Sequence, residues 1–114
     1  IPQLKYAIML NGVQSIALTK IDVLDTFDNI KICTHYQDGD YSSDQIPFDL
    51  QNPELRAVYE EKAGWNTEIQ TLDHTTAPAA LLSYLSSLED LLATQLEYIS
   101  FGPEREKLWI RTLE

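Results

Sequence analysis

Cysteine is almost absent from this 114-residue sequence, which contains only Cys33. One thiol cannot form an internal disulfide, so the chain is not a small secreted domain held together by a disulfide framework. Cys33 ends the apolar run Ile30-Lys31-Ile32-Cys33, which predicts a buried strand residue. Only Lys31 and His35 could activate it as a reactive thiolate, so the pattern favours a structural role.

Basic residues are also few. Eight Lys and Arg residues stand against eighteen Asp and Glu residues, which gives a formal net charge of −10. This balance repels nucleic-acid phosphates and anionic membranes, so we expect neither as a partner. The apolar share of 44% is ordinary for a globular domain, and the negative charge favours solubility.

Glycine, histidine and long apolar runs are scarce as well. The four glycines lie far apart, which excludes a Gly-rich phosphate loop within this sequence. His35 and His74 stand alone, with no cysteine or histidine at metal-ligand spacing, so we expect no metal site. The sequence contains no signal-peptide pattern and no run of about 20 apolar residues, and we therefore expect a cytoplasmic protein.

The two ends of the sequence lead us to expect an excised segment. The chain begins with Ile1 rather than Met, which is typical of a processed or cut product. Residues 113–114 are Leu-Glu, a pair that often remains before an affinity tag. We therefore expect one functional domain over residues 1–112 and a tag scar at residues 113–114.

The first half of the sequence predicts a helix followed by strands. Apolar spacing favours a helix over Gln3–Asn11, which Gly12 terminates. The apolar run Ser15–Thr19 predicts a strand buried on both faces of a parallel sheet. Further along, the pattern predicts Asp22 as the N-cap of a short helix over Val23–Phe27, a strand over Ile30–Tyr36, a hairpin turn at Asp38-Gly39-Asp40 and a return strand near Ile46-Pro47.

A long amphipathic helix dominates the second half. Pro78 suits the first turn of a helix that we expect to reach about Thr94. Its apolar stripe would consist of Leu81, Leu82, Leu85, Leu88, Leu91 and Leu92. Around it, the sequence predicts an edge strand over Val58–Glu61, an irregular polar segment over Asn66–Thr76, and strands over Leu96–Ser100 and Lys107–Arg111. This order of elements indicates an α/β or α+β layer arrangement.

The first segment with chemical content is Thr19-Lys20-Ile21-Asp22, at the end of a predicted strand. Ligands of open α/β sheets bind just beyond the carboxyl ends of strands. A carboxylate there can accept both donors on one guanine edge, the ring N1–H and the amino group, and adenine lacks that pair. Lys20 can lay its methylene stem along the base. This is the Asn/Thr-Lys-x-Asp pattern of guanine-binding proteins, although for this segment taken alone a solvated lysine and a helix-capping aspartate are the favoured explanation.

The second segment is Ser100-Phe101-Gly102-Pro103-Glu104-Arg105. Gly102 permits a close backbone approach and Pro103 stiffens the loop. Backbone N–H groups and the Ser100 hydroxyl can reach the O6 acceptor of the same base. The alternative is an ordinary turn between two strands. Other carboxylates, at Glu60-Glu61 and Glu89-Asp90, are interpreted as solvated faces.

Taken together, these segments resemble the adenylosuccinate synthetase family. The sharpest match is Ala17-Leu18-Thr19-Lys20-Ile21-Asp22-Val23-Leu24-Asp25, and Tyr98–Arg105 closes the series. The other matching pieces, in family order, are Leu4-Lys5-Tyr6-Ala7, Leu10-Asn11-Gly12, Ile30–Cys33, Tyr59-Glu60-Glu61 and Gly64-Trp65. The resemblance implies the C-terminal portion of the enzyme. The fold class it implies is α/β (an α+β fragment), the C-terminal part of a P-loop-NTPase-like mixed sheet with a hairpin extension and one long amphipathic helix.

The resemblance also implies a function. The family joins IMP and L-aspartate into adenylosuccinate, with GTP and Mg²⁺, in an enzyme that we expect to be a homodimer. By this resemblance Lys20, Ile21 and Asp22 lie in the guanine site, where Asp22 reads the N1 and amino donors and Lys20 flanks the base and ribose. The opposite wall would be formed by Ser100, Phe101 and Gly102, with Pro103 shaping it.

Some features depart from the family pattern. Phe101 stands where the family commonly has Thr, so a backbone contact would survive there and a side-chain contact would not. Ala63 replaces a usual Pro. The family's phosphate loop, catalytic Asp and His, Mg²⁺ ligands and Arg-rich loop would all precede Ile1, so we expect no catalytic residue in this chain and no activity from it alone. The alternative is a small stand-alone module that binds guanine nucleotides or a protein partner without catalysis.

Overall fold

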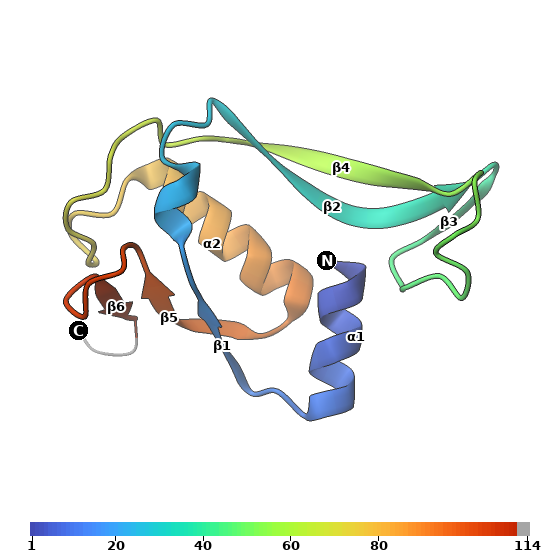
Figure 1. Ribbon diagram of the computed structural model, residues 1–114, viewed down its shortest axis with the longest axis horizontal. Coiled ribbons are helices and arrows are strands. Elements are labelled where there is room, and N and C mark those ends of the chain that lie inside the picture. Colours follow the sequence, from blue (N-terminus) through green and yellow to red (C-terminus); the bar gives the residue numbers. More distant parts are fainter. Residues whose placement is uncertain (112–114) are drawn as a thin grey trace.

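The structure is a computed structural model that describes residues 1–111, and the tag scar expected at residues 113–114 lies outside them. Two three-stranded sheets and two α-helices form the fold (Figure 1). In chain order the elements are α1 (Pro2–Asn11), β1 (Ser15–Leu18), the 3₁₀ helix η1 (Ile21–Leu24), β2 (Asn29–Asp38), β3 (Tyr41–Ser43), β4 (Arg56–Ala63), α2 (Ala79–Leu92), β5 (Gln95–Ser100) and β6 (Leu108–Ile110). Gly12 ends α1 in the left-handed conformation, with φ 60°, as the sequence predicts.

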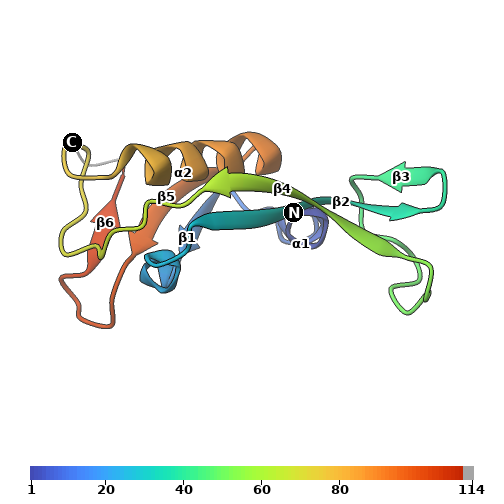
Figure 2. The ribbon, with the colours of Figure 1, turned by 90° about the horizontal axis from the view of Figure 1, so that it is seen from above.

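The first sheet is mixed and has the order β1-β5-β6. β1 pairs with β5 in parallel, and β5 pairs with β6 in antiparallel fashion. Helix α2 lies against one face of this sheet and leads directly into β5 (Figure 2). The prediction of a mixed α/β arrangement with a parallel strand pair is therefore confirmed.

Strand β1 is less buried than its sequence predicts. Its residues alternate between exposed and half-buried, so it is not covered on both faces by the residues described here. β1 is an edge strand, because β5 is its only partner within residues 1–111. An apolar run shows that a strand can be buried, but whether its two faces are covered depends on the elements that pack against it.

The second sheet has the order β3-β2-β4 and forms an antiparallel arm (β2, β3 and β4) that extends from the body (Figure 1). The predicted turn joins β2 to β3, with Asp38 paired to Tyr41 and Gly39 at φ 58°. The prediction of a return strand near Ile46-Pro47 is wrong, because the strand that returns alongside β2 is β3, at Tyr41–Ser43. A two-residue turn with a left-handed glycine lets the chain pair with β2 immediately after the turn, so the return strand begins at Tyr41.

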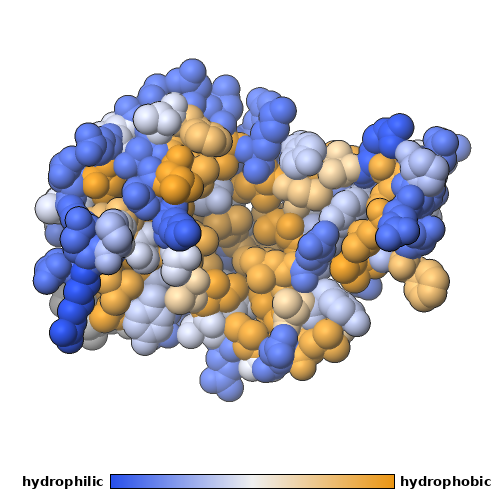
Figure 3. All heavy atoms as spheres, in the orientation of Figure 1, coloured by the Kyte–Doolittle hydropathy of each residue, from blue (hydrophilic) through white to orange (hydrophobic). Residues whose placement is uncertain are grey.

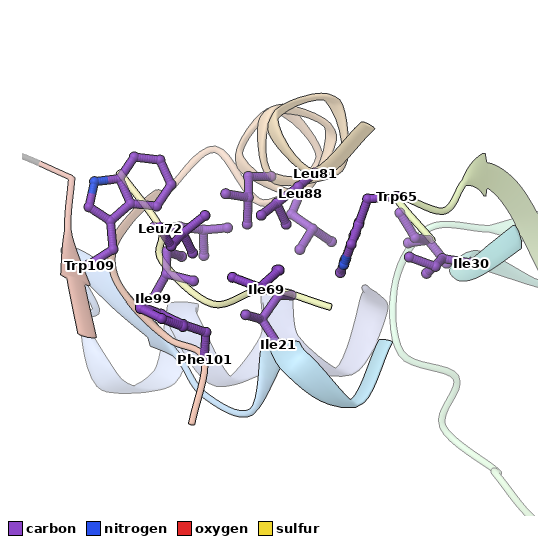
Figure 4. Packing of buried hydrophobic residues seen from close by; sticks show 13 residues of the cluster. Ile21, Ile30, Trp65, Ile69, Leu72, Leu81, Leu88, Ile99, Phe101 and Trp109 are labelled. Carbon is purple, nitrogen blue, oxygen red and sulfur yellow. The ribbon is translucent and has the colours of Figure 1, made fainter. Parts of the chain in front are cut away.

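The core forms around the leucine stripe of α2. Leu81, Leu85, Leu88 and Leu92 are buried, while Leu82 is 37% exposed and does not belong to the stripe's inner face. The helix ends at Leu92, two residues before the predicted end, because Ala93 adopts the left-handed conformation. Buried residues from the strands and loops complete the cluster, including Ile99, Trp109, Ile69 and Leu72 (Figure 4).

The segment between β4 and α2 is irregular, as predicted, but it is not merely polar. Trp65, Ile69 and Leu72 are each 7% exposed or less and belong to the core cluster. Before α2, Asp73 accepts hydrogen bonds from Thr75 and Thr76, which lower the pKa of its carboxyl from 3.8 to about 2. Through Trp65, Ile69 and Leu72, the loop contributes to the apolar core that it shares with Ile21 and Ile99.

Candidate functional site

Two sequence segments meet at one edge of the mixed sheet. β1 and β5 run parallel with Leu18 opposite Ile99, so both strands end at the same edge. Thr19-Lys20-Ile21-Asp22 follows β1, and the turn from Phe101 to Lys107 follows β5. The carboxyl edge of parallel strands is where open α/β sheets bind ligands.

A surface hollow lies between these two segments. It has a volume of about 640 Å³, within the range of roughly 300–1,000 Å³ typical of small-molecule sites. We call it the base hollow, and its lining residues are Thr19, Lys20, Asp22, Val23, Ser100, Gly102 and Pro103. Five of the seven residues singled out from the sequence thus border the same space.

Asp22 does not cap a helix, contrary to the sequence-based expectation. η1 spans Ile21–Leu24, its N-cap is Lys20, and no side-chain hydrogen bond caps it. Asp22 therefore lies inside the first turn, because Lys20 adopts a left-handed conformation and the helix starts at Ile21, two residues before the predicted start. Within residues 1–111 its carboxylate forms no hydrogen bond or ion pair, and the side chain is half-buried beside the base hollow.

Ile21 and Phe101 do not border the base hollow. Both side chains point into the core, beside Ile69 and Ile99 (Figure 4). Ile21 is 2% exposed and Phe101 is 6% exposed. Phe101 instead lines an adjacent hollow, which Asp22, Gly102 and Pro103 also border.

Several polar groups of the turn after β5 are already paired. The Phe101 N–H donates to the carbonyl of Lys107 at 2.9 Å, and the Ser100 hydroxyl donates to the carbonyl of Gly102 at 3.3 Å. Pro103 has no N–H. Among the described residues, the Gly102 N–H has no hydrogen-bond partner, so it is the donor that this turn can offer to a ligand in the base hollow.

One family model matches nearly the whole chain, including both segments that border the base hollow. The family model described as adenylosuccinate synthetase matches residues 1–109. The chain belongs to the adenylosuccinate synthetase family. The adenylosuccinate synthetase of Bacteroides fragilis (strain ATCC 25285) is 39% identical over 112 residues, which cover 97% of this chain and 26% of the relative. That of Wolbachia sp. subsp. Brugia malayi is 43% identical over 105 residues, which cover 90% and 24%.

A solved structure agrees with the sequence relatives. The fully ligated adenylosuccinate synthetase from Plasmodium falciparum superposes with a TM-score of 0.81 at 26% sequence identity, over 96% of this chain and 27% of that one. The resemblance inferred from the sequence is therefore confirmed. The chain spans about a quarter of the length of the synthetases it matches.

The sequence analysis missed the role of Asp25, a buried carboxylate that accepts hydrogen bonds from a distant loop. Asp25 is 7% exposed, and its carboxylate accepts hydrogen bonds from the Trp65 indole N–H at 2.8 Å and the Ile69 N–H at 2.9 Å. It thereby connects η1 to the loop after β4. An aspartate in an apolar stretch signals a buried acceptor, but its donors lie about 40 residues away in sequence.

Glu89 is not part of a solvated face, contrary to the expectation for the Glu89-Asp90 pair. Its carboxylate pairs with Arg111 at 2.9 Å and accepts the Leu96 N–H at 2.9 Å. Arg111 also donates to the Leu96 carbonyl at 2.8 Å. These contacts hold α2, β5 and the end of β6 together on the side away from the base hollow, so Glu89 has a structural role.

Two further features of the described residues concern metals and membranes. No group of three His, Cys, Asp or Glu side chains within residues 1–111 is placed to hold a metal ion. Over the same part of the chain, no helix has the length and apolar character needed to cross a bilayer. Cys33 lies in β2, as predicted, but it is half-buried rather than buried.

Lys20→Gly should stabilise the chain. Lys20 has φ 60° and ψ 36°, a conformation that costs an L-residue about 1–2 kcal/mol and that glycine adopts freely. After the greater entropy of an unfolded glycine is subtracted, we expect the free energy of unfolding to rise by about 0.5–1 kcal/mol in urea denaturation. Ala93→Gly, at φ 51° and far from the base hollow, is the matched control and should stabilise similarly. A lower unfolding midpoint for Lys20→Gly would contradict a strained backbone there.

Proposed function

We propose that this chain is the guanine-recognising C-terminal quarter of an adenylosuccinate synthetase, a ligase that joins IMP and L-aspartate at the expense of GTP. One observation carries the proposal. Asp22, whose carboxylate has no partner among the described residues, and Gly102, whose N–H has none, border the same hollow at the carboxyl edge of a parallel strand pair. Membership of the family supports the same role.

In this proposal, Asp22 and Gly102 contact three groups of the guanine base: the N1–H, the amino group and O6. Asp22 accepts the guanine N1–H and amino hydrogens in a charge-assisted pair, which adenine cannot supply. On the opposite wall, the Gly102 N–H donates to O6. Lys20 is exposed at the rim, where its methylene stem can cover the base plane and its ammonium can approach the ribose.

Four other residues take lesser parts in this proposal. Ile21 and Phe101 hold the two walls through the core rather than contacting the base with their side chains. Pro103 borders the hollow and shapes the turn, and Ser100 keeps the turn closed through its hydroxyl.

In this proposal the mixed sheet is the C-terminal part of a larger P-loop-NTPase-like sheet, and the arm is its hairpin extension. The free edge and half-exposed faces of β1 support this view, since parallel strands are normally covered. Apolar atoms also gather on the surface around α1, where Met9 is 67% exposed and Leu10 is 62% exposed (Figure 3). Isolated domains rarely leave such residues clustered on their surface.

Catalysis would then depend on the rest of the enzyme. The residues described here offer no cluster of ligands that fits Mg²⁺, so we assign the metal to the other three quarters of the protein. Phosphoryl transfer from GTP relies on such a metal and on a phosphate loop. We therefore propose that this chain alone is inactive, and that the intact protein is a cytoplasmic homodimer.

The second candidate is a stand-alone guanine-nucleotide-binding module. Its support is the continuous core around α2, which the chain forms from its own residues. Isothermal titration calorimetry of this polypeptide with GTP and ATP separates the two. If the chain is one quarter of an enzyme, base contacts without phosphate contacts should bind GTP more weakly than about 100 µM. Micromolar binding that prefers GTP to ATP would instead establish the module.

The reading frame provides a further test of the first proposal. It requires several hundred codons upstream of Ile1, including a phosphate loop, and the intact product should form adenylosuccinate from IMP, L-aspartate and GTP. An initiation codon immediately before Ile1, with no upstream coding sequence, would contradict it.

A further inference from the structure

The two segments that flank the base hollow are both hydrogen-bonded to neighbouring residues of one loop, and this loop lines an adjacent hollow together with Asp22 and Gly102. On one side, Asp25, which directly follows η1, accepts the Ile69 N–H at 2.9 Å. On the other, the Lys107 ammonium donates to the carbonyl of Gln70 at 2.7 Å. Because Ile69 and Gln70 are consecutive, the loop between β4 and α2 fastens both walls at nearly the same point.

Lys107 also organises the turn that carries Gly102. Its N–H donates to the Glu104 carbonyl at 3.0 Å, and its carbonyl accepts the Phe101 N–H at 2.9 Å. Its ammonium lies 5.5 Å from the centre of the Phe101 ring, within the range of a cation–π contact. The methylene groups of Lys107 pack closely against Gly102, since a Cβ added at that glycine would lie 2.8 Å from Lys107 Cγ.

We propose that Asp25, Ile69, Gln70 and Lys107 form a bracket that sets the spacing between the Asp22 carboxylate and the Gly102 N–H. In this inference, which rests on the proposed guanine site, Lys107 is a positioning residue rather than one that touches the base. A guanine edge must meet both walls at once, and a displacement of about 1 Å between them weakens oriented binding strongly.

Apolar packing alone does not supply this spacing. Ile21, Ile69 and Phe101 share the core, but apolar contacts are non-directional and tolerate small shifts of one wall against the other. Hydrogen bonds depend steeply on distance and angle. The lysine in the bracket is also charged, and a charge-assisted bond to a carbonyl is stronger than a neutral one.

The test compares two substitutions of Lys107 in the intact synthetase that contains this chain. Lys107→Met keeps the stem behind Gly102 and removes the ammonium, and we expect it to raise the KM for GTP about five-fold while kcat and the KM for IMP stay within two-fold. Lys107→Arg can still donate to Gln70 and should recover most of the loss. The control is Lys31→Met on the exposed face of β2, where no hydrogen bond or ion pair is formed within the described residues, and it should change none of these constants.

The outcomes separate the bracket from the guanine site. An unchanged GTP KM in Lys107→Met, with a raised GTP KM in Asp22→Asn, overturns the bracket alone. If Asp22→Asn also leaves the GTP KM unchanged, the proposed guanine site fails. Equal increases in the KM values for GTP, IMP and aspartate would make Lys107 a general structural residue and would likewise overturn the bracket.

The isolated chain offers a readout that needs no nucleotide. In ¹H–¹⁵N spectra of this polypeptide, Lys107→Met should shift the amide signals of Ile69 and Asp22 as well as those of residues 101–107. No hydrogen bond or ion pair joins Asp22 to Lys107 within residues 1–111, and the bracket connects them through Ile69 and Gln70. Shifts confined to residues 101–107 would show that the bracket does not extend to the opposite wall.

Discussion

An intact synthetase carrying Asp22→Asn should lose about 100-fold in kcat/KM for GTP, or about 3 kcal/mol of transition-state binding. The substitution removes a charge and one acceptor, and it turns an amide N–H towards a guanine donor. Xanthine presents one donor and one acceptor on the same edge, which match a carboxamide. We therefore expect the ratio of kcat/KM values for XTP and GTP to rise, as measured in steady-state assays with each nucleotide.

The matched control for this change is Asp28→Asn. Asp28 is an exposed carboxylate just past η1 that accepts a hydrogen bond from Asn66 at 2.8 Å, and it does not border the base hollow. It should leave kcat/KM for GTP within about two-fold, as expected for a surface change. Equal GTP kinetics in Asp22→Asn and the unsubstituted enzyme would remove Asp22 from the site.

Gly64→Ala should destabilise the chain by about 3 kcal/mol or more. A Cβ at this position would overlap the backbone carbonyl oxygen of Phe27 and approach its carbonyl carbon to 2.8 Å. Backbone atoms cannot swing aside as a flexible side chain can, so either the chain separates there or the Gly64 N–H loses its 2.8 Å hydrogen bond to Asp28. Chemical denaturation followed by tryptophan fluorescence measures the effect, because Trp65 is the next residue.

Gly12→Ala is the control for this substitution. Gly12 has a left-handed φ of 60° but nothing within 4 Å of an added Cβ, so its cost should be limited to about 1–2 kcal/mol of backbone strain. Gly64→Ala must unfold at a clearly lower denaturant concentration than Gly12→Ala. Equal midpoints would mean that the close approach of the chain at Gly64 does not limit stability.

The local pattern predicted elements whose causes lie within a few residues. The end of α1 at Gly12 and the turn at Gly39 follow from the backbone freedom of glycine. The core face of α2 follows from leucines at helical spacing, although Leu82 falls outside it. Two of the failed expectations, the return strand near Ile46-Pro47 and the capping role of Asp22, concern register and helix starts, where a shift of a few residues changes the outcome.

The family, the strand and helix types and the two segments that border the base hollow were available from the sequence alone, because short motifs and periodicity record local chemistry. The tertiary structure decided which donors remain for a ligand. It assigned the Phe101 N–H to Lys107 and the Asp25 carboxylate to Trp65 and Ile69, and it left the Gly102 N–H without a partner within residues 1–111. Such pairings join residues up to 44 positions apart, and only the packed chain brings them within hydrogen-bonding distance.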